Sequence, residues 1–112
     1  MRVLVTVSPR IYREALELSL RNSRPDLEVR AAAPEDAELE LAGFRPHLLV
    51  HNDTVEFGPE DITSVLCRVE MGYPDGMDAR VRTGQTVFGV RDMSTEDLLR
   101  AVDVTATVGV LH

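Results

Sequence analysis

The apolar run Leu48-Leu49-Val50 limits the fold of this chain more than any other feature. An unbroken apolar run is typical of a strand that is covered on both faces, as the central strands of parallel sheets are. A β-branched run over residues 3–7 opens the chain, and residues 27–31 alternate as an edge strand does. Helix-like segments separate these three runs. The order βαβαβ predicts an α/β domain with a parallel sheet and right-handed crossovers.

Both helices of this first half have predicted boundaries. Ser8 is a good N-cap and Pro9 a good first helical residue, and Asn22-Ser23-Arg24-Pro25 is expected to end the helix. The broad apolar side of that helix is expected to hold Ile11, Tyr12, Ala15, Leu16, Leu18 and Leu20. A second, acidic helix is predicted from Pro34 to Ala42, with Gly43 as its C′ residue.

The second half has a different pattern. Residues 65–71 alternate, with Val65, Cys67, Val69 and Met71 on one side, which indicates a strand. Residues 59–62 can form only a turn or a short helix, and Tyr73-Pro74-Asp75-Gly76 predicts a turn. Residues 79–83 and 86–90 flank Gly84-Gln85, which predicts a β-hairpin with a type II′ turn.

A last helix is predicted to begin at Ser94, with Asp97 completing an acidic capping box. The nearly uncharged stretch over 104–111 leaves three alternatives open. It could extend this helix, pair as a strand or dock on another subunit, because an apolar tail must be covered by something.

Composition excludes several kinds of chemistry. The length of 112 residues fits one domain, and all twelve basic groups are arginine. The absence of lysine excludes Schiff-base chemistry, a P-loop lysine and a lysine general base. The single cysteine excludes an internal disulfide and a multi-cysteine metal site.

Charge and hydropathy lead to further expectations. The net charge of −7 argues against nucleic-acid binding, and no apolar stretch approaches the ~20 residues of a membrane span. The opening residues are typical of a strand and not of a signal peptide, so we expect a cytoplasmic protein without a membrane partner. Residues 51–112 carry eleven acidic residues against five arginines. This acidic half suits a basic partner or simply solubility.

Three stretches resemble the receiver domain of bacterial response regulators. Residues 1–16, MRVLVTVSPRIYREAL, resemble its first strand and helix, and residues 45–52, RPHLLVHN, resemble its third strand. Residues 87–99, VFGVRDMSTEDLL, resemble its fifth strand and helix. The resemblance implies a single receiver-like α/β domain over residues 1–112. Its expected fold is a three-layer, flavodoxin-like parallel sheet in the N-terminal half, a β-hairpin in place of the fourth helix, and a C-terminal helix.

The chemistry of that family needs an acidic pair, a phospho-accepting aspartate and a lysine. In this chain those positions fall on Val7 and Ser8, on Asn52, and on Arg91. A shift of one residue would place Asp53 at the acceptor position, still without the acidic pair and lysine. The resemblance therefore implies a stand-alone pseudo-receiver that is not phosphorylated, is not an enzyme and has no cofactor.

Such a domain is expected to act through protein–protein contacts in bacterial signalling or regulation. Its apolar tail and exposed hairpin favour a homodimer. The chain is also similar to short bacterial proteins that carry a Tyr-Pro-Asp-Gly motif, here Tyr73 to Gly76, and a terminal Leu-Leu-x-x-Val-Asp, here Leu98 to Asp103. That second resemblance implies no activity.

The alternative function is a small-ligand site at the carboxyl ends of the first and third strands. Ser8, Asn52 and Asp53 should meet there and could hold a phosphate or a nucleotide, with Arg91 as a further candidate. The simpler interpretation is that Ser8 caps its helix and that Asn52 and Asp53 form a turn. Ser8, His51 and Asp53 contain the residue types of a hydrolase triad, but they lack a nucleophile elbow.

Two further groups of residues also have both a functional and a simpler interpretation. The metal candidates His47, His51, Asp53, Cys67 and His112 are better explained as a core cysteine and partly exposed histidines, so no metal is expected. Arg80 and Arg82, with Arg68 and Arg91 near them, indicate either an anion-binding or interaction face, or a solvated sheet face paired with Glu70 and Asp78.

Overall fold

A computed structural model describes residues 1–72, 78–84 and 86–111. The strands are β1 (Arg2–Val5), β2 (Glu28–Ala31), β3 (Leu48–Asn52), β4 (Cys67–Met71), β5 (Ala79–Thr83) and β6 (Thr86–Val90). The helices are α1 (Arg10–Ser23), a 3₁₀ turn η1 (Pro34–Asp36), α2 (Ala37–Phe44) and α3 (Thr95–Leu111).

The strands form one mixed sheet in the order β2-β1-β3-β4-β5-β6. Strands β1 to β4 are parallel, and β5 is antiparallel to both of its neighbours. The predicted α/β class is confirmed, as are the parallel first half and the central position of β3, whose five residues are all buried. Because β5 reverses the chain once and β6 reverses it again, β6 runs in the same direction as β1 to β4.

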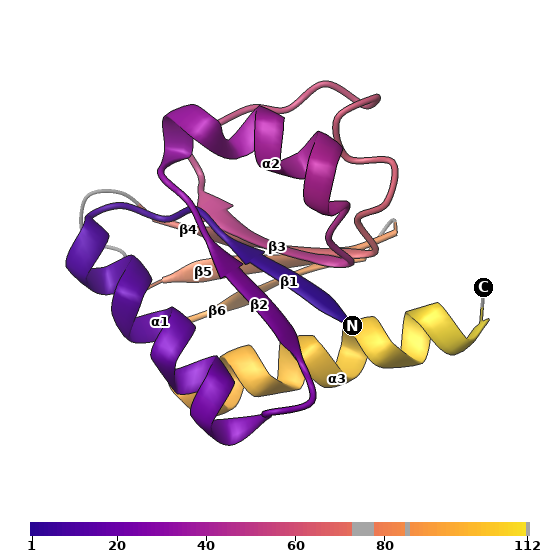
Figure 1. Ribbon diagram of the computed structural model, residues 1–112. Helices are drawn as coiled ribbons and strands as arrows, with labels where there is room; N and C mark the ends of the chain where they lie inside the picture. The colour runs from indigo at the N-terminus through magenta and orange to yellow at the C-terminus, as the bar shows by residue number, and fades with distance from the viewer. Residues whose placement is uncertain (73–77, 85, 112) are drawn as a thin grey trace.

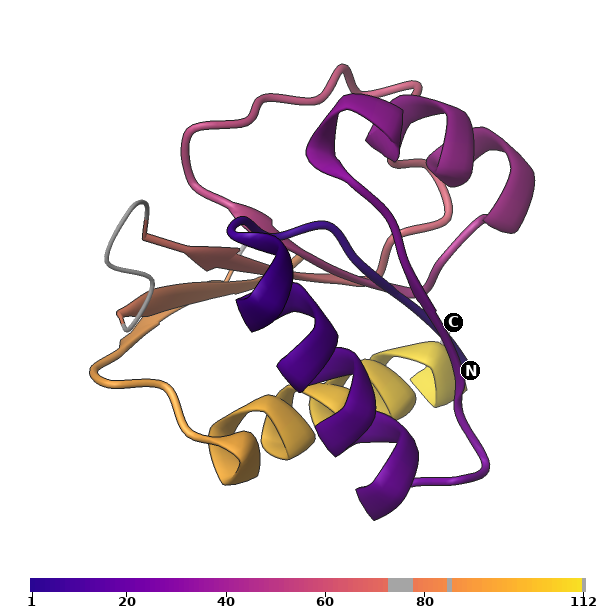
Figure 2. The same ribbon diagram turned by 60° about the vertical axis from the view of Figure 1, so that its left-hand side comes forward.

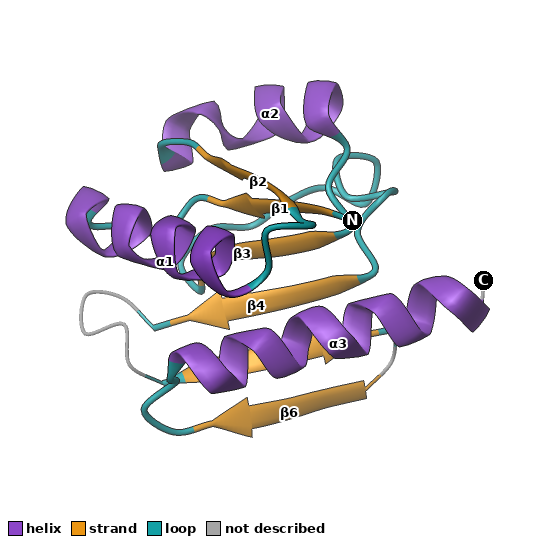
Figure 3. Cartoon of the chain, turned by 60° about the horizontal axis from the view of Figure 1, so that its bottom comes forward, coloured by secondary structure: helices purple, strands orange, loops and turns teal. Residues whose placement is uncertain are grey.

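Helices cover the two faces of the sheet unequally. Helices α1 and α3 lie side by side on one face, and α2 lies on the other (Figures 1 and 3). The segment over 53–66 that joins β3 to β4 lies on the same face as α2, where Phe57, Ile62 and Val65 pack against the sheet (Figure 2). No helix among the described residues covers the α2 face of β5 and β6.

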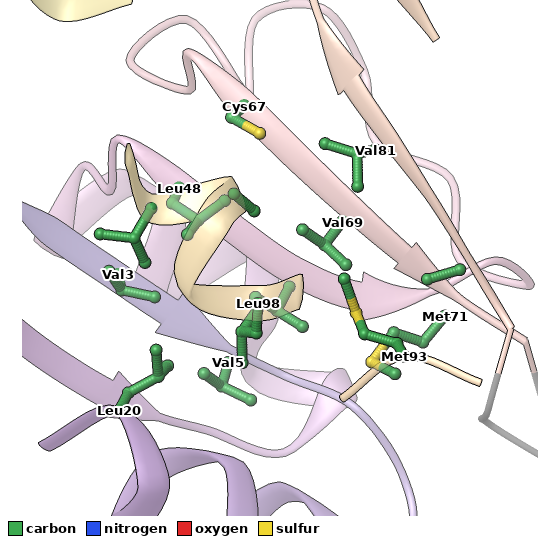
Figure 4. Close-up of a cluster of buried hydrophobic side chains, with 14 of the residues drawn as sticks. Val3, Val5, Leu20, Leu48, Cys67, Val69, Met71, Val81, Met93 and Leu98 are labelled. Carbon is green, nitrogen blue, oxygen red and sulfur yellow. The ribbon is translucent and has the colours of Figure 1, made fainter. Parts of the chain in front are cut away.

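The larger hydrophobic cluster fills the space between the sheet and the helices α1 and α3 (Figure 4). Val3 and Val5 of β1, Val69 of β4 and Val81 of β5 point into it, and Leu98 enters it from α3. A smaller cluster of Leu4, Leu41 and Leu49 lies under α2. Alternate strand residues supply the two clusters, as the period of two requires.

Helix α1 ends at Ser23 as predicted, but its predicted start is wrong. The helix begins at Arg10, and Pro9 occupies the N-cap position without a side-chain hydrogen bond. Its predicted apolar side also divides in two. Tyr12, Leu16 and Leu20 pack on the core, while the remaining members, Ile11, Ala15 and Leu18, are exposed. The reason is that the helix rests on a sheet through one narrow stripe of i, i+4, i+8 positions.

Helix α2 continues past its predicted end. Gly43 lies inside the helix, and the left-handed residue that ends it is Arg45, with φ of 51°. The amide of Arg45 donates to the carbonyl of Leu41, so the C-terminal motif forms two residues later than the glycine indicated.

The predictions for β4 and the hairpin are largely confirmed. Cys67, Val69 and Met71 share the larger cluster, but Val65 precedes the strand and packs on the α2 side. Residues 79–83 and 86–90 pair as an antiparallel hairpin, and residues 59–64 form turns. The predicted Tyr73–Gly76 turn and the Gln85 position that sets the hairpin turn type lie outside the described residues.

Helix α3 begins with the predicted capping box. The Asp97 carboxylate accepts a hydrogen bond from the Ser94 amide at 3.0 Å, and the Ser94 hydroxyl accepts one from the Asp97 amide at 3.3 Å. Of the three alternatives for residues 104–111, the helical extension is the one observed, and Thr105 is buried within it. None of the helices formed by the described residues has the length and apolar character needed to cross a bilayer.

Candidate functional site

The carboxyl ends of β1 and β3 bring two of the predicted site residues together. The backbone N–H of Ser8 donates a hydrogen bond of 2.7 Å to Oδ1 of Asn52. The predicted side-chain cap by Ser8 is absent, since helix α1 begins later. Asn52 is 3% exposed, and its Nδ2 has no hydrogen-bond partner among the described residues. This strand end therefore presents one buried amide donor with spare hydrogen-bonding capacity.

The other two predicted site residues lie elsewhere. The amide of Asp53 donates to the carbonyl of Met71 at 2.8 Å, and its exposed side chain lines a pocket on the α2 face. Arg91 follows β6, at the same end of the sheet as Asn52. Val90 and Asn52 share a register row that runs through β5 and β4, so they are separated by three strand spacings, roughly 14 Å. The structure joins Ser8 with Asn52 only.

His51 points to the opposite face from Asn52, because consecutive strand residues alternate. Its Nδ1 lies 2.8 Å from the carbonyl oxygen of Asn52, its Nε2 accepts a 3.3 Å hydrogen bond from Nε of Arg68, and its ring meets Phe57 edge to face. Burial lowers the pKa of His51 to about 4. The imidazole is therefore neutral, and it does not join Ser8 in the hydrolase arrangement.

The metal candidates do not converge either. Cys67 lies in the cluster under α1 and α3, on the opposite face of the sheet from His51. Nδ1 of His47 accepts a hydrogen bond from the amide of Arg2 at 3.0 Å. His112 is outside the described residues, and within the described part of the chain no three His, Cys, Asp or Glu side chains are placed to hold an ion.

An arginine-rich surface occupies the α2 face of β4 and β5. Arg68 pairs in register with Arg82, and Glu70 pairs with Arg80. The buried Glu70 carboxylate forms ion pairs with Arg80, at 3.5 Å, and with Arg82. The prediction that Arg68, Arg80 and Arg82 share one face is confirmed, as is the pairing with Glu70.

Two details of that prediction are wrong. Asp78 does not pair with these arginines, since its Oδ1 accepts a hydrogen bond from the amide of Asp92. Arg91 is not part of the surface either, because it follows β6 and lines a separate hollow beside Asp78.

A pocket of about 360 Å³ lies over this arginine surface. Arg68, Glu70, Arg80 and Arg82 form its floor, and the segment after β3 supplies Asp53, Val55, Glu56 and Phe57. The guanidinium carbon of Arg68 lies 5.9 Å from the centre of the Phe57 ring. Phe57 carried no functional signal in the sequence, because the loop over 53–66 has no periodicity that would place it over a strand.

A larger hollow of about 680 Å³ lies along the β2 edge, where Arg21 is paired with Glu17 and Arg30 with Glu40.

Searches against protein-family models, curated proteins and solved structures found no match.

Proposed function

We propose that the chain is a cytoplasmic, receiver-like binding module of bacterial signalling or regulation that is not phosphorylated and acts through contact with another protein. The parallel order β2-β1-β3-β4 supports the receiver-like interpretation, because flavodoxin-like folds share it. The antiparallel β5 is a departure from that pattern. It separates Arg91 from Asn52, which further supports the loss of phosphorylation chemistry.

The hydrogen bond between Ser8 and Asn52 is the observation that carries the non-phosphorylated interpretation. Oδ1 of Asn52 is occupied by a backbone N–H at the position that aligns with the phospho-acceptor. Neither Val7 nor Ser8 offers a carboxylate to Mg²⁺, which prefers such oxygen ligands.

Incubation with acetyl phosphate and Mg²⁺, read by intact mass, tests this part of the proposal. We expect no phosphoryl adduct on the parent chain, and none on Asn52→Asp, because the acidic pair is still missing. A stable adduct of one phosphoryl group on the parent chain would overturn it.

The outer edge of β6, which pairs with no other strand in the described part of the chain, supports contact with a second copy of the chain. Val87 and Phe88 are exposed by 46% and 43% and lie on opposite faces, and β6 has no charged residue. The other edge strand, β2, is protected: it carries Glu28 and Arg30, and the Arg21 guanidinium donates to the Val29 carbonyl at 2.6 Å. Natural sheets usually block their edges with such charges, so the open β6 edge suits strand pairing.

The geometry of β6 also suits a symmetric pairing. Residues that flank a two-residue hairpin loop pair with each other, so Val87 and Gly89 turn their N–H and C=O groups away from β5. Two antiparallel copies of β6 centred on Phe88 would meet without like charges opposite each other. The result would be one continuous sheet through a homodimer.

Gly89 offers a matched pair of variants for this contact. A Cβ at Gly89 meets no atom within 4 Å, so Gly89→Ala should leave self-association unchanged. Gly89→Pro removes an outward N–H without breaking the ladder to β5, and we expect it to weaken association by about tenfold or more. Light scattering after size-exclusion chromatography measures both, with circular dichroism to check folding. A parent chain that remains monomeric, or an equal effect of both variants, would refute the homodimer.

The spare Nδ2 of Asn52 favours a second candidate, a small phosphate or nucleotide bound at the ends of β1 and β3. Thermal-shift assays with inorganic phosphate and AMP test it. A shift that is lost in Asn52→Leu supports this candidate, and the absence of any shift removes it.

A further inference from the structure

Arg68 and Arg82 stand directly opposite each other on neighbouring strands. Like charges in that position destabilise a sheet. Glu70 pairs with Arg80 and Arg82, whereas Arg68 has no ion pair with any described residue. The floor of the pocket therefore holds more cationic than anionic charge, and this local conflict is of the kind that marks functional positions.

The guanidinium groups of Arg68 and Arg82 each donate a hydrogen bond from Nε to a buried side chain. Nε of Arg68 donates to the imidazole of His51, and Nε of Arg82 donates to Glu70. His51 and Glu70 are register partners on β3 and β4, so the two supports are themselves adjacent. The terminal nitrogens of Arg68 and Arg82 form no hydrogen bond with the described residues, which leaves two forks of N–H donors directed away from their supports.

The rest of the pocket limits the size and charge of an occupant. Its volume of about 360 Å³ is in the range of small-molecule sites. Phe57 gives it an aromatic wall beside Arg68. Asp53 and Glu56 at the rim would repel a polyanion, so they favour a ligand with a single anionic group.

We propose that this pocket binds a small organic oxyanion, a carboxylate or a phosphate monoester, whose oxygens accept hydrogen bonds from the terminal nitrogens of Arg68 and Arg82. Paired guanidinium donors match the geometry of such oxygens, and the bound charge relieves the repulsion between the two arginines. The site is separate from the β6 edge and from the Ser8–Asn52 contact.

Nuclear magnetic resonance titration of the full chain tests the proposal. The side-chain Nε–Hε signals of arginine are followed during separate additions of inorganic phosphate and acetate, with chloride at equal ionic strength as the reference. We expect saturable shifts at Arg68 and Arg82 that chloride does not produce. Saturation by only one of the two anions supports the site and identifies the oxyanion that it accepts.

Arg68→Gln should weaken binding about tenfold or more, whereas Arg100→Gln, which makes the same charge change on α3, should not alter it. Arg82→Lys keeps the charge but loses the fork, and it provides a second variant if Arg68→Gln folds poorly. The proposal is overturned if neither anion gives saturable shifts, or if Arg68→Gln and Arg100→Gln bind alike. Either result leaves the tests at Asn52 and Gly89 unaffected.

Discussion

The imidazole of His51 connects β3, β4 and the loop that follows β3. Because Arg68 Nε–H can only donate, Nε2 of His51 is the unprotonated nitrogen, and Nδ1 carries the proton toward the Asn52 carbonyl. A protonated ring would place a second cation against Arg68 and lose this hydrogen bond. The contacts of His51 are therefore specific for its neutral form.

The stability of the fold should depend on pH through His51. Its pKa is about 4 in the folded chain and about 6.5 when unfolded, so the unfolded state binds the extra proton between these values. The contribution is complete above pH about 6.5 and decreases as the pH falls toward 4. Between pH about 7 and 5 we expect a loss of about 2 kcal/mol from this group.

Urea unfolding of the parent chain and of His51→Gln measures that contribution. The glutamine oxygen can still accept from Arg68, but it does not titrate. The neighbouring Asp53 and Glu70 side chains are present in both chains, so the comparison isolates the imidazole of His51. Equal pH slopes for the two chains would show that His51 is not the source.

Sequence reasoning predicted individual residues well where the cause is local. Ser94 and Asp97 lie three positions apart, and their capping box is confirmed. Ser8 has an equally good local reason to cap a helix, but its backbone instead bonds to Asn52, 44 positions away. Helix-capping preferences depend on neighbouring residues, so they cannot predict a contact with a residue so far away in the sequence. The end of α2 at Arg45 instead of Gly43 is a similar case, since Phe44 continues the helix and packs against the distant strand residues of the cluster under α2.

Among the elements, the hairpin of β5 and β6 was predictable from the sequence, but its effect on the positions of Arg82 and Arg91 was not. Gly84 with flanking alternation indicates β5 and β6, because a two-residue turn fixes their pairing. Because β5 lies between β4 and β6, Arg91, which follows β6, is three strand spacings from Asn52 instead of two. The same pairing sets Arg82 opposite Arg68, a register that the sequence leaves open. Strand order and register depend on contacts between distant segments, which local patterns do not contain.

The contribution of the capping box at the start of α3 to stability can be tested by mutation. Ser94→Ala removes the acceptor for the Asp97 amide and should lower the free energy of unfolding by about 1 kcal/mol. Ser94→Thr keeps the hydroxyl and should retain most of that stability. Chemical denaturation of the three chains decides the matter, and an alanine variant as stable as the parent would show that the cap is energetically neutral.

Across the whole molecule, buried apolar side chains are concentrated on one face of the sheet. The larger cluster takes its buried residues from α1, α3 and strands β1 to β5, and Val90 of β6 packs against it. The cluster under α2 has only three buried leucines at its centre. The α2 face of β4 and β5 carries polar side chains instead of a helix, and it is there that the arginine pocket lies. The less covered face is thus the one available for ligands.

The difference between buried and exposed side chains predicts unequal costs for two leucine truncations. Leu98 is 1% exposed in the larger cluster, while Leu39 on α2 is 76% exposed. Leu98→Ala should cost about 3 kcal/mol through lost burial and a cavity, and Leu39→Ala at most about 0.5 kcal/mol. Thermal or urea unfolding compares them. Similar losses for both would contradict the burial described for α3.

The place of Cys67 gives the chain a chemical reporter of its own unfolding. The thiol is fully buried between β4 and α3, and burial raises its pKa while a hydrogen bond with Thr105 offsets part of that rise. A thiol-specific reagent needs an accessible thiolate, so it can modify the folded protein only when the core opens. Since this is the only cysteine, the labelling rate would report how often α3 separates from the sheet.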